Sequence, residues 1–289
     1  VTNGEIALPI GGRLYLPESW TSDRDRCAEA GVPDTVEFLS KPEIALKLIE
    51  QALADGVPKA PVLGDSVYGD GGPMRRALRA QGMEYFFQIE ERLLAWTEPV
   101  NIEQSRKHWR VADGQPEPQK VRAIAEEIPS QQWKSSRWKD VNGEKQTTRI
   151  AWLPIYLLSD LDEETGDWPP TLLVLDWPEG KADPYHCYVA HLKGKPNKAR
   201  CLRLSRSRFQ IEQYFQRDKD DLGLDHFEGR SWRGFHHHLA LAAVAYIFVL
   251  ISYLETKKKF WIYVGGSTTG DSAVASALDR MLSVLPHEI

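Results

Sequence analysis

The sequence predicts an α/β fold, and three observations support this class. Short apolar strands alternate with helical patterns over residues 5–96. A strand-rich segment, often interrupted by Gly and Pro, occupies residues 97–200, and two long helical patterns occupy residues 201–256. Because strands that alternate with helices form a sheet covered by helices, we predict an α/β core that carries a β-rich insertion at 97–200. The pattern weakens over residues 257–289, which we interpret as a C-terminal tail.

Composition indicates a folded globular protein. The 289 residues suffice for one large domain or two small ones, and 42% are hydrophobic while 27% are charged. The net charge of −5 gives no overall basicity, so nucleic-acid binding would have to come from local patches. The three cysteines are scattered and predict neither a metal site nor a disulfide framework, which favours a reducing cytosol.

Targeting signals are not predicted. The N-terminus lacks a basic stretch followed by an apolar one, so we expect no secretory signal. The uncharged run at 239–254 is shorter than the ~20 residues that a membrane-spanning helix needs. We therefore interpret it as a buried core helix and expect no membrane association.

The first elements are two short strands and a helix. Residues 5–16 read as strands joined at Gly11 and Gly12, and Ser40 with Glu43 forms a capping box that begins a helix. Nothing before residue 5 could begin a domain, so we expect the start of the fold to lie upstream of Val1.

Asp65 follows an apolar strand at 60–64, and a Gly-rich turn leads from it to a basic helix that begins at Pro73. Residues 84–89 form the next strand. Functional side chains gather at the carboxyl ends of strands in α/β sheets, and Asp65 occupies such an end. The alternative is that Asp65 only caps the turn that follows it.

The strand-rich segment contains Asn142-Gly143, a hairpin signal, and strands at 150–158, 171–177 and 185–192. We accordingly predict four parts: 1–96 as the first part of the core, 97–200 as the β-rich insertion, 201–256 as the second part of the core, and 257–289 as the tail.

A line of charge marks the helical pattern at 205–232. At about 100° per residue, Arg208, Glu212 and Lys219 fall within roughly 40° of each other, and Ser205 joins the same stripe. One alternative is a set of ordinary surface pairs. The other combines Glu212 with Asp65, because carboxylates can hold paired Mg²⁺ ions that act on phosphodiesters, while Arg208 and Lys219 bind backbone phosphates.

These residues resemble a known signature. The line of Arg208, Glu212 and Lys219, with Ser205 in place of a Tyr, is similar to the C-terminal signature of the DDE transposases of bacterial insertion sequences. VLGDSVYGD at 62–70 resembles the strand that carries the second catalytic acid. Three further segments resemble one branch of these transposases. They are RLYLPESW at 13–20, AGVPDTVEFLSKPEIAL at 30–46 and GLDHFEGRSWRGFHHHLAL at 223–241.

The resemblance implies an RNase H-like core with a β-rich insertion before the Glu-bearing helix. It makes Asp65 and Glu212 catalytic acids and ligands of two Mg²⁺ (or Mn²⁺) ions. The implied activity is DNA strand cleavage and transfer at insertion-sequence ends, by a homodimer bound to DNA in the bacterial cytoplasm at the nucleoid. The first catalytic Asp is expected upstream of Val1, so the core would lack its first strand and this chain would be an incomplete copy.

The other acids in this chain fit the role of the first catalytic Asp poorly. Asp23 and Asp25 lie in a loop, and Asp70 shares the loop of Asp65. Asp176 ends an apolar strand, but it lies inside the insertion and in the wrong order.

Further basic and His residues extend the expected DNA surface. Arg230 and Arg233 beside Trp232 predict a phosphate-binding and stacking patch, with a packed, solvated turn as the alternative. His236 to His238 point in different directions on a helix, which favours helix-start contacts or a DNA-facing edge over a metal site. Residues 193–208 are rich in Lys and Arg. This segment is expected to be either a solvated loop or a contact with the DNA backbone.

Two rival functions remain. The first is a catalytically inactive DNA-binding or regulatory remnant of a transposase. The second, weaker one is a hydrolase that acts on sugars with two carboxylates and no metal.

Overall fold

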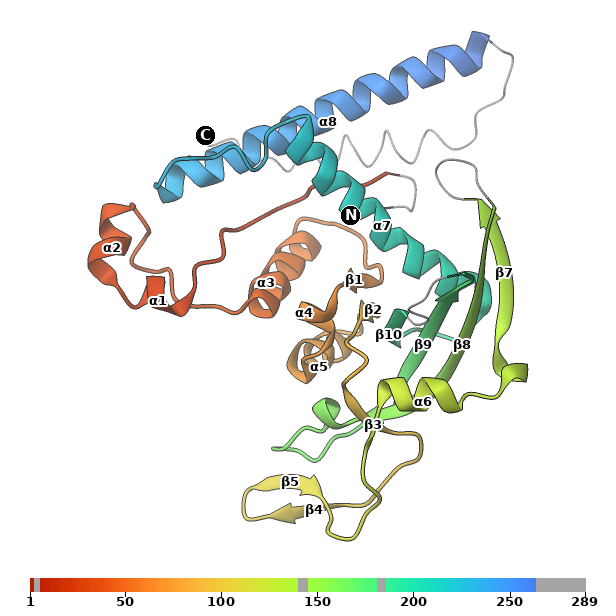
Figure 1. The fold of residues 1–289 in the computed structure, drawn as a ribbon. Coiled ribbons are helices and arrows are strands. Elements are labelled where there is room, and N and C mark those ends of the chain that lie inside the picture. Colours follow the sequence, from red (N-terminus) through yellow and green to blue (C-terminus); the bar gives the residue numbers. More distant parts are fainter. Residues whose placement is uncertain (3–5, 140–144, 181–185, 264–289) are drawn as a thin grey trace. The chain divides into compact units, whose positions relative to one another are not determined.

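The computed structural model describes residues 1–2, 6–139, 145–180 and 186–263 (Figure 1). Contacts between Cα atoms divide the chain into two compact units. We call residues 41–46 and 58–208 the sheet unit, and residues 1–40, 47–57 and 209–289 the helical unit. The predicted hairpin turn at Asn142-Gly143 and most of the predicted tail lie outside the described residues.

The sheet unit contains an eight-stranded mixed sheet in the order β1-β2-β10-β9-β8-β3-β6, with β7 paired to β8. Among the described strands of this sheet, β1 and β2 run parallel and the other pairs are antiparallel. Strands β4 (Ile102–Ser105) and β5 (His108–Val111) form a separate hairpin. The strands of the main sheet are β1 (Val62–Gly64), β2 (Tyr85–Gln88), β3 (Leu94–Trp96), β6 (Gln119–Lys120), β7 (Lys134–Lys139), β8 (Lys145–Leu157), β9 (Thr171–Pro178) and β10 (His186–His191).

Strands β8, β9 and β10 confirm the strands predicted in the second half of the sheet unit. They pair with one another and reach β2 through β10, where Val189 lies opposite Phe87. The segment expected as an insertion therefore shares one sheet with β1 and β2. The predicted α/β class is confirmed, and the fold is consistent with an RNase H-like domain, whereas the boundaries at 97 and 201 stay predictions.

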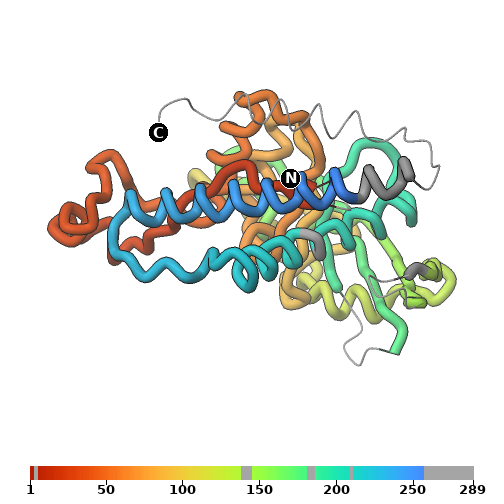
Figure 2. The backbone as a smooth tube through the Cα atoms, turned by 90° about the horizontal axis from the view of Figure 1, so that it is seen from above, coloured from red at the N-terminus to blue at the C-terminus, as the bar shows by residue number. Residues whose placement is uncertain are grey.

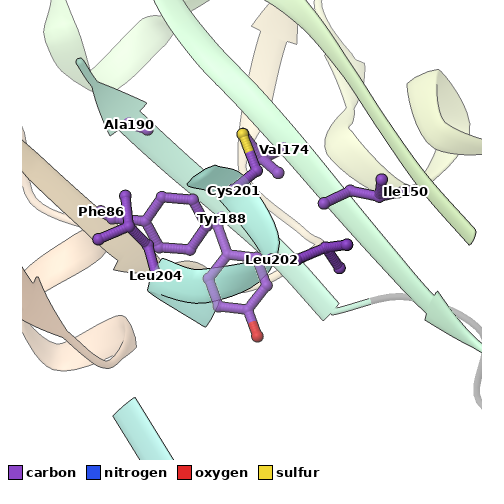
Figure 3. Close-up of a cluster of buried hydrophobic side chains, with 8 residues drawn as sticks. All are labelled: Phe86, Ile150, Val174, Tyr188, Ala190, Cys201, Leu202 and Leu204. Carbon is purple, nitrogen blue, oxygen red and sulfur yellow. The ribbon is translucent and has the colours of Figure 1, made fainter. Parts of the chain in front are cut away.

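The first half of α7 (Lys198–Asp220) covers one face of this sheet. Cys201, Leu202 and Leu204 pack there against a cluster of buried strand residues (Figure 3). The strand residues of this cluster are Phe86, Ile150, Val174, Tyr188 and Ala190.

Helix α5 (Gly72–Ala80) covers the opposite face, because successive strand residues point to opposite sides. Tyr85 and Phe87 flank Phe86 and stack at 5.2 Å between ring centroids. Arg79 of α5 donates a hydrogen bond of 2.6 Å to the Tyr85 hydroxyl. The remaining helices of the sheet unit are α4 (Ser66–Gly69), α6 (Val121–Glu127), η1 (Ser130–Gln132) and η2 (Leu158–Asp160).

The helical unit contains α1 (Glu18–Thr21), α2 (Arg24–Glu29), the second half of α7 and α8 (Trp232–Tyr263). Figure 2 shows the chain running on past α7 and turning back into α8. Tyr214 of α7 meets Tyr246 of α8 edge to face at 4.7 Å between centroids, and Ala7 is buried beside them. Helix α3 (Lys41–Ala54) begins directly after Ser40, as the capping box predicted.

Residues 8–16 are not strands, contrary to the prediction. The described segment forms only one isolated bridge, between Thr2 and Ala7. Pro9 has no backbone N–H to donate to a ladder. Leu16 instead packs with Cys27 and neighbouring apolar residues in a small core of its own.

The prediction that residues 239–254 form a buried helix is also wrong. Helix α8 is longer, and only one stripe of it packs: Ala242 and Tyr246 are buried, while Leu241 is 69% and Phe248 70% exposed. Residues 232–256 are long and apolar enough to cross a membrane, by length and composition alone, with 6% of the most apolar window buried.

Candidate active site

Asp65 lies where β1 ends, at the carboxyl end of the parallel pair of strands. Its side chain is exposed, and Oδ1 accepts a hydrogen bond of 3.0 Å from Val67 N, which caps α4. Among the described residues, none donates to Oδ2. Asp65 therefore caps the turn and still presents one carboxylate oxygen for another partner.

The turn after Asp65 is fastened to the end of β2. Gly69 lies so close to the carbonyl oxygen of Gln88 that a Cβ at this position would collide with it. The Asp70 carboxylate accepts a hydrogen bond of 3.0 Å from Glu90 N, and Arg75 donates to the Gly69 carbonyl. These contacts hold the backbone that positions Asp65.

A buried charge network anchors Arg75 in turn. Its Nε lies 2.8 Å from Oδ1 of Asp160, and both side chains are completely buried. Asp160 also accepts from Arg79 at 3.1 Å and from the Thr171 hydroxyl at 2.6 Å. No local pattern in the sequence predicted this network, because the basic residues of α5 indicate cations but not the acid that pairs with them.

Three of the other candidate acids, Asp23, Asp70 and Asp176, have structural roles. Asp23 caps α2 by accepting from Arg26 N at 3.0 Å. Burial is the main cause that raises the pKa of Asp70, against the hydrogen bond from Glu90 N, which lowers it. Asp176 is 8% exposed and accepts from the Thr148 hydroxyl. Asp65 is thus the exposed acid of this set that follows a parallel strand.

Helix α7 carries the predicted charge line as one continuous helix. Glu212 and Lys219 are exposed and Arg208 is half-buried. Ser205, at the position of the expected Tyr, is buried and donates its hydroxyl proton to the Leu202 carbonyl at 3.0 Å. Ser205 therefore forms a hydrogen bond within its own helix. The exposed residues of the charge line are Glu212 and Lys219.

The two predicted acids belong to different units. Asp65 lies in the sheet unit and Glu212 in the helical unit, and α7 passes from one unit to the other directly after Arg208. The structure therefore defines each acid within its own surroundings.

Some of the remaining predicted cations are exposed, and others form contacts within the protein. Arg230 and Arg233 are exposed at the start of α8. In the basic run, Arg200 pairs with Glu84 at 2.7 Å and Lys198 donates to the Ser135 carbonyl at 3.0 Å. Part of that run thus holds the fold together rather than facing solvent.

The three consecutive histidines make contacts at the start of α8. A ring nitrogen of His236 lies 2.8 Å from the Trp232 carbonyl, and one of His238 lies 2.9 Å from the Gly223 carbonyl. His237 is exposed. The predicted helix-start contacts are confirmed for the first and third histidine.

A divalent hard cation fits the chemistry of Asp65. Within the described ranges, no group of three or more His, Cys, Asp or Glu side chains could hold a metal ion by itself. The outward Oδ2 of Asp65 is nevertheless a carboxylate oxygen, the ligand type that Mg²⁺ prefers, and Mg²⁺ needs few protein ligands. A metal here would therefore require a second acid from another part of the chain.

The mixed sheet with helices defines an α/β domain, and an exposed acid lies at the end of its parallel pair of strands. A family model described as DDE superfamily endonuclease matches residues 1–147, and the chain belongs to this family. The matched range contains Asp65 and ends before Glu212. No curated protein matches the chain.

Proposed function

We propose that this protein is a DNA transposase that cleaves and transfers DNA strands at the ends of an insertion sequence. The observation that carries the proposal is Asp65, an exposed acid at the end of a parallel strand, with one carboxylate oxygen directed to no described donor. It lies inside the segment that matches the DDE endonucleases. The resemblance of the α7 charge line to the third-acid helix supports Glu212 as its partner.

The proposed cofactor is a pair of Mg²⁺ or Mn²⁺ ions held by Asp65 and Glu212. Two such ions activate the attacking oxygen and stabilise the leaving oxygen of a phosphodiester. Asp65 contributes a carboxylate whose direction is set by the hydrogen bond from Val67 N. Glu212 contributes from the exposed surface of a long helix.

The proposed DNA contacts come from Arg208, Lys219, Arg230 and Arg233. Cations of this kind neutralise backbone phosphates and fix the register of the duplex without reading sequence. Insertion-sequence ends and target DNA are the expected partners, with a homodimer assembled on them. The expected location is the bacterial cytoplasm at the nucleoid.

Metal-dependent nicking of supercoiled DNA by the natural full-length protein tests the proposal. Asp65→Asn and Glu212→Gln should each reduce nicking to background. Asp23→Asn is the matched control, because Asp23 caps α2 through the same kind of hydrogen bond and should leave nicking unchanged. Full activity in Glu212→Gln or Asp65→Asn would refute the assignment.

A non-catalytic DNA-binding protein is the second candidate. It is favoured by the exposed cations Lys219, Arg230 and Arg233, which could bind phosphates without any metal site. Its signature would be salt-sensitive DNA binding that is equal in wild type, Asp65→Asn and Glu212→Gln, without nicking. The match to DDE endonucleases argues against the sugar hydrolase.

A further inference from the structure

An open pocket of about 920 Å³ lies in the helical unit, and neither predicted acid is among its lining residues. The region of α1 and α2 forms one wall, and the connection from α7 to α8 forms the other. Five of its fifteen lining residues are aromatic. They are Tyr15, Trp20, Phe227, Trp232 and Phe235.

The two walls are fixed to each other. Trp232 N donates to the Ala30 carbonyl at 2.8 Å, and the Trp232 ring packs on the small core around Leu16 and Cys27. Ser231 caps α8 by accepting from Gly234 N at 3.1 Å. A backbone hydrogen bond and core packing therefore join the two walls of the pocket.

Two arginines, Arg26 and Arg230, line the pocket. The Arg26 guanidinium carbon sits 3.8 Å from the Trp20 ring centroid, and the side chain is exposed. Arg230 is also exposed, and within the described ranges neither arginine forms an ion pair. Glu29 is the one acid among the lining residues. The lining thus combines a planar cation on an aromatic ring with a second positive charge.

We propose that this pocket binds an unpaired nucleotide of single-stranded DNA. The base would stack on the outer face of the Arg26 guanidinium, which Trp20 supports from beneath, and Arg230 would bind the adjoining phosphate. Bases stack on guanidinium planes and aromatic rings, whereas paired bases inside a duplex do not present their faces. The inference rests on the proposed DNA-cleaving function, because strand cleavage produces unpaired ends.

Binding of a labelled single-stranded 12-mer, compared with a duplex of the same sequence, tests the inference by fluorescence anisotropy. Arg26→Ala should weaken single-strand binding by roughly 5- to 100-fold, the loss expected for one stacked base. Arg26→Lys should weaken it nearly as much, because lysine keeps the charge but lacks the plane. Duplex binding should change by less than about two-fold in both variants, because phosphates elsewhere on the surface dominate it.

Lys47→Ala is the matched control, because Lys47 is exposed on α3 outside the pocket and its loss removes the same charge. Equal losses in Lys47→Ala and Arg26→Ala, or normal single-strand binding by Arg26→Lys, would overturn the pocket. If these losses fail while nicking still depends on Asp65, only the pocket is wrong. Failure of the wild type to bind either DNA would refute the proposed function as well.

Discussion

Arg75 and Asp160 form a completely buried ion pair, with 2.8 Å between Nε and Oδ1. The two residues lie 85 positions apart in the sequence. Because Arg75 also donates to the Gly69 carbonyl, the pair connects η2 with the turn that positions Asp65. The candidate acid is thus exposed, whereas the ion pair that supports its turn is completely buried.

Asp160→Asn should lower the free energy of unfolding by about 3–5 kcal/mol, because it leaves Arg75 and Arg79 buried without a counter-charge. Urea denaturation measures the change. Glu103→Gln is the control: its pair with Arg110 has side chains 42% and 51% exposed, so its loss should cost far less than that of the buried pair. Equal costs for the two variants would mean that the buried pair contributes no more than a surface pair.

Three neighbouring glycines give a graded test of the turn after Asp65. A Cβ at Gly69 would collide with the Gln88 carbonyl, and one at Gly72 with the Ser159 carbonyl. Gly69→Ala and Gly72→Ala should each cost about 1–3 kcal/mol. At Gly71 the nearest atom lies 4.0 Å away, so Gly71→Ala should cost less than about 1 kcal/mol. Thermal unfolding of the three variants checks this order, and a reversed order would contradict the close approach.

Local patterns predicted the parts of the site that depend on one segment. The apolar run before Asp65 and the helical spacing of Arg208, Glu212 and Lys219 specify a strand end and a helix without reference to the rest of the chain. Both elements are confirmed. The chemical role of their acids came only from a resemblance, because spacing alone also describes a cap and a set of surface pairs.

Contacts between residues far apart in the sequence could not be predicted from local patterns. Strand β10 joins β2, and Arg75 joins Asp160, across distances in sequence that no periodicity encodes. The prediction for helix α8 was wrong for a related reason. An apolar run predicts a buried helix, but tertiary packing buries only the stripe around Ala242 and Tyr246. The extended residues 8–16 had strand composition but found no ladder partner among the described residues.

Asp70 should make stability depend on pH. Burial raises its pKa above the ordinary 3.8, so the folded state favours the protonated carboxyl, and this stability is lost as pH rises through the raised value. Asp70→Asn keeps an oxygen that accepts from Glu90 N but carries no charge. We expect the variant to be more stable than wild type at neutral pH, with the difference vanishing near about pH 3. Urea denaturation at both pH values measures it, and a less stable variant at neutral pH would contradict the direction.

Lys219 should contribute one phosphate contact to duplex binding. Lys219→Gln should weaken binding of insertion-sequence end DNA and reduce the slope of log affinity against log salt by about 1. The exposed Lys47 on α3 supplies the control, because Lys47→Gln removes the same charge. Binding measured at several salt concentrations checks the difference. Identical slopes in the two variants would remove Lys219 from the proposed DNA surface.

The three free cysteines should report separately on the two units. Cys27 is 2% exposed in the helical unit, whereas Cys187 and Cys201 are 3% and 0% exposed in the sheet unit. Burial raises the pKa of Cys201 to about 11, so both access and thiolate formation oppose its alkylation in the folded state. Iodoacetamide labelling across a urea series, read by mass spectrometry, should show no modification without denaturant and one shared midpoint for Cys187 and Cys201. Separate midpoints for those two would mean that β10 and α7 do not unfold together, although Cys201 shares one buried cluster with the β10 residues Tyr188 and Ala190.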